Sequence, residues 1–575
     1  MTHWSDFRRV VFVDFEFQAP DGHPPQPICV VARQWGEDQS RKVWLDGEAL
    51  GGPPYPVAPD TLFVAYFASA ELGCHLALDW PFPAQVLDLY AEFRVATNGL
   101  NPPSGSGLLG ALAYYGVPSL GVHEKDEMRS LALRGGPWSS SEREALLDYC
   151  ESDVLALEEL LGRMKEQIDL PRALLRGRYM KAVARMEAVG VPFDTHTLAL
   201  LEQHWASLKL HIIGELDAES RIYDGTRFVT RAFIEWINAH QLPWPLSPTG
   251  QPLLDRTTFE QMSRRYPQVK PIAEVRRFLS RIKPPAFTVG ADGRNRAMLS
   301  PYRSKTGRNQ PSNARFIFGA PAWARGLIQP KPGYGLAYID WSQQEFAIAA
   351  ALSEDPAMIE AYQSGDPYLA LAKQTGGAPP DATKASHPRI REQFKLCVLG
   401  VQYGMGPESL AAQLGQSPCH ARALLALHRA AYPRYWRWAQ AAADSAVLTG
   451  GIQAVFGWRL QVTSATKPRT LLNFPMQANG AEMLRLACIY ATEAGVRVCA
   501  PVHDALLVEA PLPELDAAVA LTRACMAQAS GVVLAGLVVR TDVQRVESPG
   551  RLLDGRGEAM WRRVVEFLES QECRV

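Results

Sequence analysis

The sequence predicts an α/β protein of several domains. Its 575 residues are too many for a single hydrophobic core. Two short apolar runs, at residues 10–17 and 336–339, are typical of buried strands and carry or precede acidic residues. Patterns of helical period follow at residues 139–168 and beyond residue 342. Strands and helices therefore share both halves of the chain.

The overall composition excludes some classes of protein. The net charge of −1 means that a nucleic-acid surface must come from local clusters of Lys and Arg. Nine cysteines without a CxxC pair favour a reduced, cytoplasmic protein without structural zinc or disulfides. The N-terminus lacks an apolar signal core, and the longest apolar run, residues 531–539, is too short to span a bilayer. We expect no membrane partner.

The first strand, residues 10–17, carries two acids two residues apart. Period-two geometry places Asp14 and Glu16 on the same face. Ionised carboxylates on a buried strand are costly unless they are paired or bind a metal, so this pair is a candidate site. The alternative is one acid facing inward beside an Arg and one at an edge.

A helix is predicted at residues 139–168. Ser139 and Glu142 form a capping-box pattern at its start, and Pro171 is expected to stop it. Tyr149 and Asp153 lie one turn apart and share a face.

The stretch 335–352 predicts a strand that delivers Asp340, followed by a helix that Ser342 can cap. Residues 496–509 predict two strands joined by a tight turn at His503 and Asp504. If these elements share a sheet, Asp340 and Asp504 are neighbours. Two such carboxylates raise each other's pKa unless divalent cations lie between them, as in two-metal phosphoryl transfer. The alternative is that Asp340 merely caps the next helix.

Residues 389–404 predict a helix with a basic and aromatic stripe. Arg391, Lys395, Leu399 and Tyr403 recur every four residues. The cations could bind a triphosphate and the aromatic ring could cover a nucleobase. The alternative is an amphipathic helix with two solvated basic residues.

Taken together, these motifs resemble those of family A DNA polymerases, the group related to bacterial DNA polymerase I. DWSQQE at 340–345 resembles the first carboxylate motif, and Val502, His503 and Asp504 resemble the second. Further matches to the family are Arg308 in the TGR segment, which touches primer and incoming nucleotide, and Arg469, Asn473 and Gln477, which contact template and minor groove.

The resemblance covers most of residues 171–550 and implies a right-hand fold with palm, fingers and thumb. It implies that Asp340 and Asp504 hold two Mg²⁺, with Mn²⁺ as an alternative, while Arg391 and Lys395 clamp the triphosphate. Leu399 and Tyr403 would line the nascent-pair pocket, and Glu345 would block a ribose 2′-hydroxyl. The chain departs from the family at Ala505, where a glutamate is usual, and at Leu399, where an aromatic residue is usual.

The N-terminal motifs resemble an RNase H-like 3′–5′ exonuclease domain of the DEDD type, in its tyrosine-bearing subclass. By resemblance, Asp14, Glu16 and Asp153 would hold two divalent metals and Tyr149 would orient the attacking water. Glu71 is the candidate for the remaining ligand, although Tyr66 and Phe67 replace the usual His-Asn. Asp79 and Asp88 are the alternatives.

The predicted division is an exonuclease-like domain at 1–170 and a polymerase domain at 171–575. Within the latter we expect the thumb at about 196–290, the palm at about 291–353 and 449–575, and the fingers at about 354–448. Four cations at 275–283 would either grip duplex phosphates or form a solvated helix face. We also expect a hairpin at 451–459, an amphipathic helix at 473–494 and a C-terminal helix at 558–571.

The predicted function is DNA-directed DNA synthesis from primer-template DNA and deoxynucleoside triphosphates, with 3′–5′ proofreading, in a bacterial or phage setting. We expect no 5′-nuclease domain of the kind found in full-length bacterial polymerase I, and therefore no nick translation. Glu345 and the exonuclease-like domain argue against a single-subunit RNA polymerase. A nuclease with an inactive polymerase domain and a non-catalytic DNA-binding protein remain alternatives.

Overall fold

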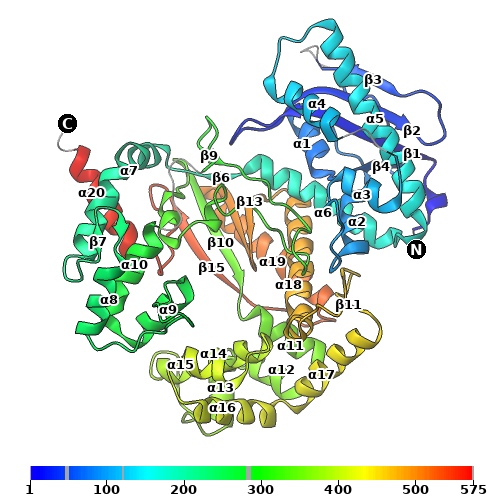
Figure 1. The fold of residues 1–575 in the computed structure, drawn as a ribbon. Helices are drawn as coiled ribbons and strands as arrows, with labels where there is room; N and C mark the ends of the chain where they lie inside the picture. Colours follow the sequence, from blue (N-terminus) through cyan, green and yellow to red (C-terminus); the bar gives the residue numbers. More distant parts are fainter. Residues whose placement is uncertain (1, 46–50, 119–121, 280–286, 573–575) are drawn as a thin grey trace.

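The computed structural model describes residues 2–45, 51–118, 122–279 and 287–572. It contains one large sheet in the N-terminal region and another in the C-terminal half, with helices around both (Figure 1). The predicted α/β class is confirmed. Within the described residues, no helix is long and apolar enough to cross a membrane.

The N-terminal sheet has the strand order β3-β2-β1-β4-β5. Its strands and the helices around it are β1 (Arg9–Gln18), β2 (Gln26–Gln34), β3 (Arg41–Trp44), β4 (Thr61–Ala65), β5 (Gln85–Asp88), α1 (Ser69–Ala77), α2 (Leu89–Thr97), α3 (Leu108–Tyr115), α4 (Val122–Arg134), α5 (Ser140–Met164) and α6 (Leu170–Val189). β1 is antiparallel to β2 and parallel to β4. Val13 and Phe15 pack towards α1 and α6, while Phe12 packs towards α3 and α5. Both faces of β1 are thus buried, which explains its nearly continuous apolar sequence.

The C-terminal sheet is antiparallel, with the order β13-β14-β10-β15. Its elements are β10 (Tyr334–Trp341), β13 (Arg497–Val502), β14 (Ala505–Pro511), β15 (Thr541–Glu547) and the covering helices α18 (Pro468–Glu493) and α19 (Leu515–Val533). The central position of β10 fixes the residues that it delivers between two neighbouring strands.

A purely helical region follows β10, at the bottom of Figure 1. It comprises α11 (Gln344–Ser353), α12 (Pro356–Gln363), α13 (Pro367–Gln374), α14 (Pro388–Gln402), α15 (Pro407–Leu414), α16 (Pro418–Ala431) and α17 (Pro433–Leu448). Many of these helices begin with Pro in the first turn, where its missing N–H costs nothing.

A second helical group lies at the left of Figure 1. It comprises α7 (Thr195–Leu216), α8 (Thr230–Ala239), α9 (Arg256–Arg265), α10 (Lys270–Leu279) and α20 (Glu558–Glu572). The predicted C-terminal helix is therefore confirmed, and it packs against α7. The short pairs are β6 (Val191–Pro192) with β9 (Arg294–Asn295), β7 (Tyr223–Asp224) with β8 (Arg227–Phe228), and β11 (Gly451–Gln453) with β12 (Arg459–Gln461).

Proline and helix boundaries differ from prediction in two places. Pro171 does not stop a helix but lies in the first turn of α6, whose N-cap is Asp169. The helix predicted at 473–494 begins earlier, at Pro468, and is buried along most of its length rather than amphipathic. A two-sided burial of this kind leaves no polar face for periodicity to reveal.

The cationic stripe predicted at 275–283 is only partly described, since residues 281 and 283 lie outside the described ranges. Arg276 is not available to a phosphate backbone. Its Nη2 donates to Leu254 O at 2.7 Å, and its guanidinium packs over the rings of Phe228 and Phe259. This arginine stabilises the core of the helical group instead.

Candidate active sites

Asp340 and Asp504 lie next to each other at one end of the C-terminal sheet. Asp340 is the penultimate residue of β10 and pairs with Ala505, the residue after Asp504. His503 and Asp504 form the turn between β13 and β14, and the Trp341 amide donates to Asp504 O at 3.1 Å. The structure thus brings together two carboxylates that are 164 positions apart in the sequence.

The pKa values of both aspartates are raised. Burial and then the charge of Asp340 raise the pKa of Asp504 to about 6, while Arg308 opposes the shift. Burial also raises the pKa of Asp340, but the like charge that acts on it is Asp542 of β15, its direct cross-strand partner. The strand pairing places Asp542 directly opposite Asp340 on β15 and Ala505, the residue after Asp504, opposite it on β14. A cation at this place would favour the ionised forms of all these groups.

Ser342 does not cap α11 as predicted. Its hydroxyl donates to Asp542 Oδ2 at 2.6 Å, and Gln343, with φ of 52°, occupies the position before the helix. The Ser342 hydroxyl therefore binds a residue of β15 that is remote in sequence instead of capping the helix that follows it.

A cluster of three side chains joins α11, α14 and α18. Tyr403 Oη donates to Glu345 Oε1 at 2.8 Å, and Gln477 Nε2 donates to the same oxygen. Gln477 Nε2 also donates to Tyr403 Oη at 3.2 Å. The Glu345 carboxylate is therefore held in one orientation by residues from two other elements.

The basic stripe of α14 has partners within the protein. Arg391 Nε donates to Asp366 Oδ2, and its guanidinium lies over the Tyr368 ring. Lys395 Nζ lies 3.8 Å from Glu392 Oε2. Leu399 is half-buried on the same face. The predicted stripe is present, but Arg391 is oriented by a carboxylate that the sequence did not indicate.

The remaining predicted polymerase residues surround this region. The charge of Arg308 acts on Asp504, on His503 and on Tyr403, so its guanidinium belongs to the same cluster. His503 has a φ of 55°, as the tight turn requires. The exposed Arg469 lies at the start of α18, and the half-buried Asn473 follows one turn later.

In the N-terminal sheet, Glu71 lies close to the two acids of β1. Glu71 is on α1 and only 4% exposed. Burial raises its pKa well above the ordinary value, and the charges of Asp14, then Asp88 and Glu16, add to the shift. A buried carboxylate among like charges is unfavourable without a compensating cation or proton.

The two alternatives to Glu71 have other places in the fold. Asp88 caps α2, because its Oδ1 accepts from the Phe67 and Tyr90 amides at 3.0 and 2.9 Å. Asp79 has a left-handed φ of 55° just beyond α1.

Helix α5 brings Tyr149 and Asp153 to the same site. Burial raises the pKa of Tyr149, and the charges of Asp153, Glu16 and Asp14 add to it, which places the phenol among these acids. Cys150 is a neighbour that the motifs did not indicate: its thiol donates to Asp14 Oδ2 at 3.3 Å. The one sequence signal for this contact was the position of Cys150 directly after Tyr149 on the predicted helix.

Comparisons with known proteins bear on the C-terminal site and on the fold. Residues 318–545 match the family model described as DNA polymerase family A. The chain carries a family A DNA polymerase domain. Asp340, Glu345, Arg391 and Asp504 lie inside the matched part of this polymerase domain, whereas Arg308 and the N-terminal carboxylates lie before it.

The similar proteins come from bacteria and a phage. "DNA polymerase I, thermostable" of Thermus thermophilus is 25% identical over 431 residues, which is 69% of the chain and 50% of the relative. The DNA polymerase of Mycobacterium phage D29 is 28% identical over 260 residues, 43% of the chain and 41% of the relative. The chain spans about half the length of the first of these curated relatives.

A solved structure shares the fold across nearly the whole chain. It is the "POL domain of Pol1 from M. smegmatis complex with DNA primer-template and dNTP", with a TM-score of 0.70 and 18% identity, and the match covers 96% of each chain. At this identity the likeness concerns the fold alone, and it extends over the N-terminal sheet as well as the polymerase domain.

Among the described residues, no group of three or more His, Cys, Asp or Glu side chains is already arranged to hold a metal ion. The carboxylate pairs nevertheless fit such ions, because oxygen ligands suit Mg²⁺ and Mn²⁺ and because the raised pKa values of Asp504 and Glu71 mark charge that a cation would stabilise.

Proposed function

We propose that this chain is a DNA-directed DNA polymerase that adds deoxynucleotides to a primer 3′ end. The observation that carries the proposal is the adjacency of Asp340 and Asp504 at one end of an antiparallel sheet, inside a family A domain. The similar mycobacterial domain was solved with primer-template DNA and dNTP, and we propose the same two partners here.

Family A DNA polymerases are metal-dependent, and Asp340 and Asp504 would hold two Mg²⁺ in this chain, with Mn²⁺ as an alternative. When bound, these ions lower the pKa of the primer 3′-hydroxyl and neutralise charge on the triphosphate. Arg391 and Lys395 bind the phosphates, and Asp366 holds the Arg391 guanidinium in one orientation beforehand.

Other residues of the chain select and orient the substrates. Glu345 excludes a ribose 2′-hydroxyl, and the bonds from Tyr403 and Gln477 keep its carboxylate in place for this purpose. Leu399 and Tyr403 line the nascent-pair pocket. Arg308 and His503 contact the primer end, and Arg469, Asn473 and Gln477 contact the template and the minor groove.

Primer extension tests this function. Asp340→Ala and Asp504→Ala should abolish extension, since each removes a charged ligand. Asp444→Ala is a matched control, because Asp444 is an exposed residue of α17 that accepts a hydrogen bond from Gln440 Nε2 at 2.8 Å. Extension by Asp340→Ala at nearly the wild-type rate would refute the assignment and leave the chain as a nuclease or a DNA-binding protein.

We also propose a 3′–5′ exonuclease in the N-terminal unit. Asp14, Glu16, Glu71 and Asp153 would hold two divalent metals, and Tyr149 would orient the attacking water. The support is that the acids of β1 act both on Glu71 of α1 and, together with Asp153 of α5, on the Tyr149 phenol. Asp14→Ala should abolish degradation of a 3′-mismatched primer and spare extension. Loss of both activities would show that the variant is misfolded rather than that the sites are separate.

The proposed layout follows from these sites. The exonuclease-like unit comprises residues 1–170, and the polymerase unit comprises 171–575, with thumb, palm and fingers at the positions given by the sequence. We place the activity in a bacterial or phage cytoplasm, since the relatives come from bacteria and a mycobacteriophage.

A further inference from the structure

The turn that carries Arg308 is held from outside the polymerase unit. Residues 302–308 form a tight turn in which Gly307, with φ of 75°, donates to Ser304 O at 2.9 Å. Such a turn leaves backbone carbonyls facing outwards, and buried carbonyls need donors. The groups that donate to these carbonyls therefore fix the position of the Arg308 backbone, from which its side chain extends.

Several of these donors come from α2 and the residue that follows it. Asn98 is fully buried, and its Nδ2 donates to Lys305 O at 2.7 Å and to Arg459 O at 2.8 Å. Arg94 Nη2 donates to Arg303 O at 3.1 Å. One buried amide thus joins the turn to the β11–β12 hairpin.

The polymerase unit supplies the other contacts. Trp458 Nε1 donates to Lys305 O at 3.0 Å, and Arg485 Nη1 donates to Gly307 O at 2.7 Å. The rings of Tyr302 and Trp458 stack with centroids 5.4 Å apart. Lys305 O therefore receives one hydrogen bond from each unit, which makes it the point where both determine the position of the turn.

The fit around Asn98 is close on the hairpin side as well. Gln461 N donates to Asn98 O at 2.7 Å. The next residue, Gly99, has a φ of 95°, and a Cβ there would lie 2.3 Å from Gln461 O. No side chain fits at that position without moving the hairpin. The end of α2 therefore has a fixed position relative to both the turn and the hairpin.

We propose that Asn98 is a positioning residue of the polymerase site: through Lys305 O it fixes the turn that presents Arg308 to the primer end. This inference rests on the proposed polymerase function. It makes the exonuclease-like unit a part of the polymerase site. It also makes α2 a link between the two sites, because the N-cap of α2 is Asp88, whose charge acts on Glu71, and its C-cap is Asn98.

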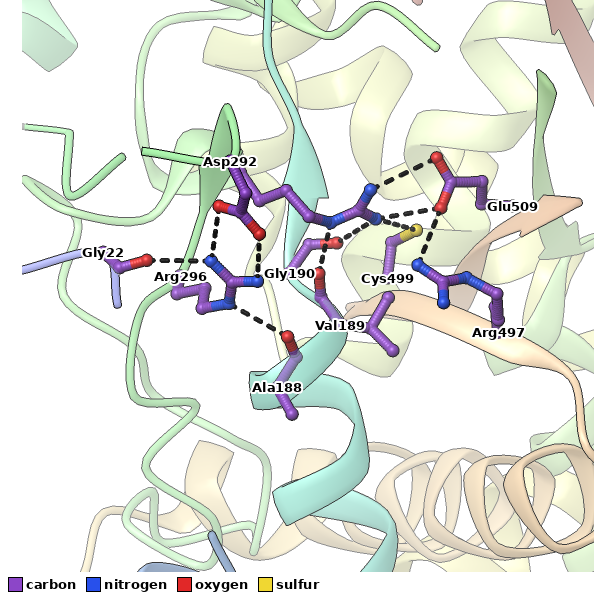
Figure 2. Close-up of polar contacts among 10 residues, drawn as sticks. Gly22, Ala188, Val189, Gly190, Asp292, Arg296, Arg497, Cys499 and Glu509 are labelled. Carbon is purple, nitrogen blue, oxygen red and sulfur yellow. Dashed lines mark hydrogen bonds and ion pairs between the residues drawn. The ribbon is translucent and has the colours of Figure 1, made fainter. Parts of the chain in front are cut away.

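A second contact between the units offers the control. Arg296 Nη1 donates to Gly22 O at 2.9 Å and to Asp292 Oδ1 at 2.8 Å (Figure 2). Arg315 Nη1 lies 3.0 Å from Asp21 Oδ1 nearby. A Cβ on Gly22 would lie 2.4 Å from Gly290 N, so Gly22→Ala wedges the units apart there without touching residues 302–308.

The test is steady-state single-nucleotide addition by the full chain at varied primer-template concentration. Asn98→Ala should raise the KM for primer-template roughly tenfold with kcat changed less than about twofold, as expected for lost hydrogen bonds at a buried position. In an Arg308→Ala background the same substitution should have no further effect, because both act through one side chain. Gly22→Ala should leave the KM unchanged.

Three results would overturn the inference: an unchanged KM in Asn98→Ala, additive effects of Asn98→Ala and Arg308→Ala, or an equal KM rise in Gly22→Ala, which would indicate general loosening of the interface. If Asn98→Ala does not fold, Arg94→Ala, which removes donors from the same turn, carries the test with the same expected results. A wild-type chain that extends no primer would instead refute the polymerase function.

Discussion

The Glu345 cluster gives the sharpest test of substrate selection. Tyr403→Phe removes only the hydroxyl that donates to Glu345 Oε1 at 2.8 Å, and it leaves the bond from Gln477 in place. The carboxylate can then swing away from the sugar position. We expect ribonucleotides to be accepted more readily by Tyr403→Phe, and still more readily by Glu345→Ala, which deletes the blocking group.

The size of the effect follows from the exposure of the bond. A hydrogen bond to a charged group contributes about 1.5–3 kcal/mol when it is well shielded. Tyr403 is 42% exposed, and Gln477 still holds the same oxygen, so we reduce this to about 1 kcal/mol. That corresponds to a roughly fivefold loss of discrimination against ribonucleotides.

The assay is the ratio of ribonucleotide to deoxynucleotide incorporation in single turnovers on one template. Tyr432→Phe is the matched control, because the Tyr432 hydroxyl is buried in the same helical region and has no hydrogen-bond partner among the described residues. An unchanged ratio in Glu345→Ala would refute the reasoning, since it would mean that Glu345 does not face the incoming sugar.

Three further outcomes are expected. Leu399→Tyr should weaken discrimination against dideoxynucleotides roughly fivefold to tenfold by supplying a hydroxyl near the missing 3′-hydroxyl, and an unchanged dideoxy-to-deoxy ratio would place Leu399 elsewhere. Ala505→Glu should lower the melting temperature in a chelator, because Ala505 is fully buried opposite Asp340, and added Mg²⁺ should restore more stability to this variant than to the wild type. Burial raises the pKa of Asp88 to about 7. The protonated side chain therefore contributes its full stability below about pH 4, and up to about 4 kcal/mol of the free energy of unfolding is lost as the pH rises through 7. Asp88→Asn should make the free energy of unfolding, measured in urea with a chelator, depend less on pH.

The sequence allowed the strands and their acids to be predicted because the signals are local. β10, β13 and β14 each read as an apolar run, and the turn at Asp504 separates two of them. The adjacency of Asp340 and Asp504 required the further assumption of a shared sheet, which the pairing of Asp340 with Ala505 confirms. Likewise, the capping box at Ser139 is formed, since its two members are three residues apart.

Partners remote in sequence explain what could not be predicted. Asp366 orients Arg391 from another helix, and Asn98 reaches Lys305 across more than 200 positions. A polar side chain in isolation has several candidate partners, and only the tertiary fold decides among them. Ser342 illustrates the same rule. Its sequence pattern predicted a local helix cap, but its hydroxyl donates to Asp542 instead.

Asp542 also changes how the departure at Ala505 is understood. In the sheet, Asp340 lies in a row between Ala505 on β14 and Asp542 on β15. The acid that the family carries after the second aspartate is missing on one side of Asp340, and an acid is present on the other side. Because this second acid lies 202 positions downstream of Asp340, the motif alone gives the wrong number of carboxylates around Asp340. Burial raises the pKa of Asp340, and the charge of Asp542, which the motif does not indicate, adds to the shift.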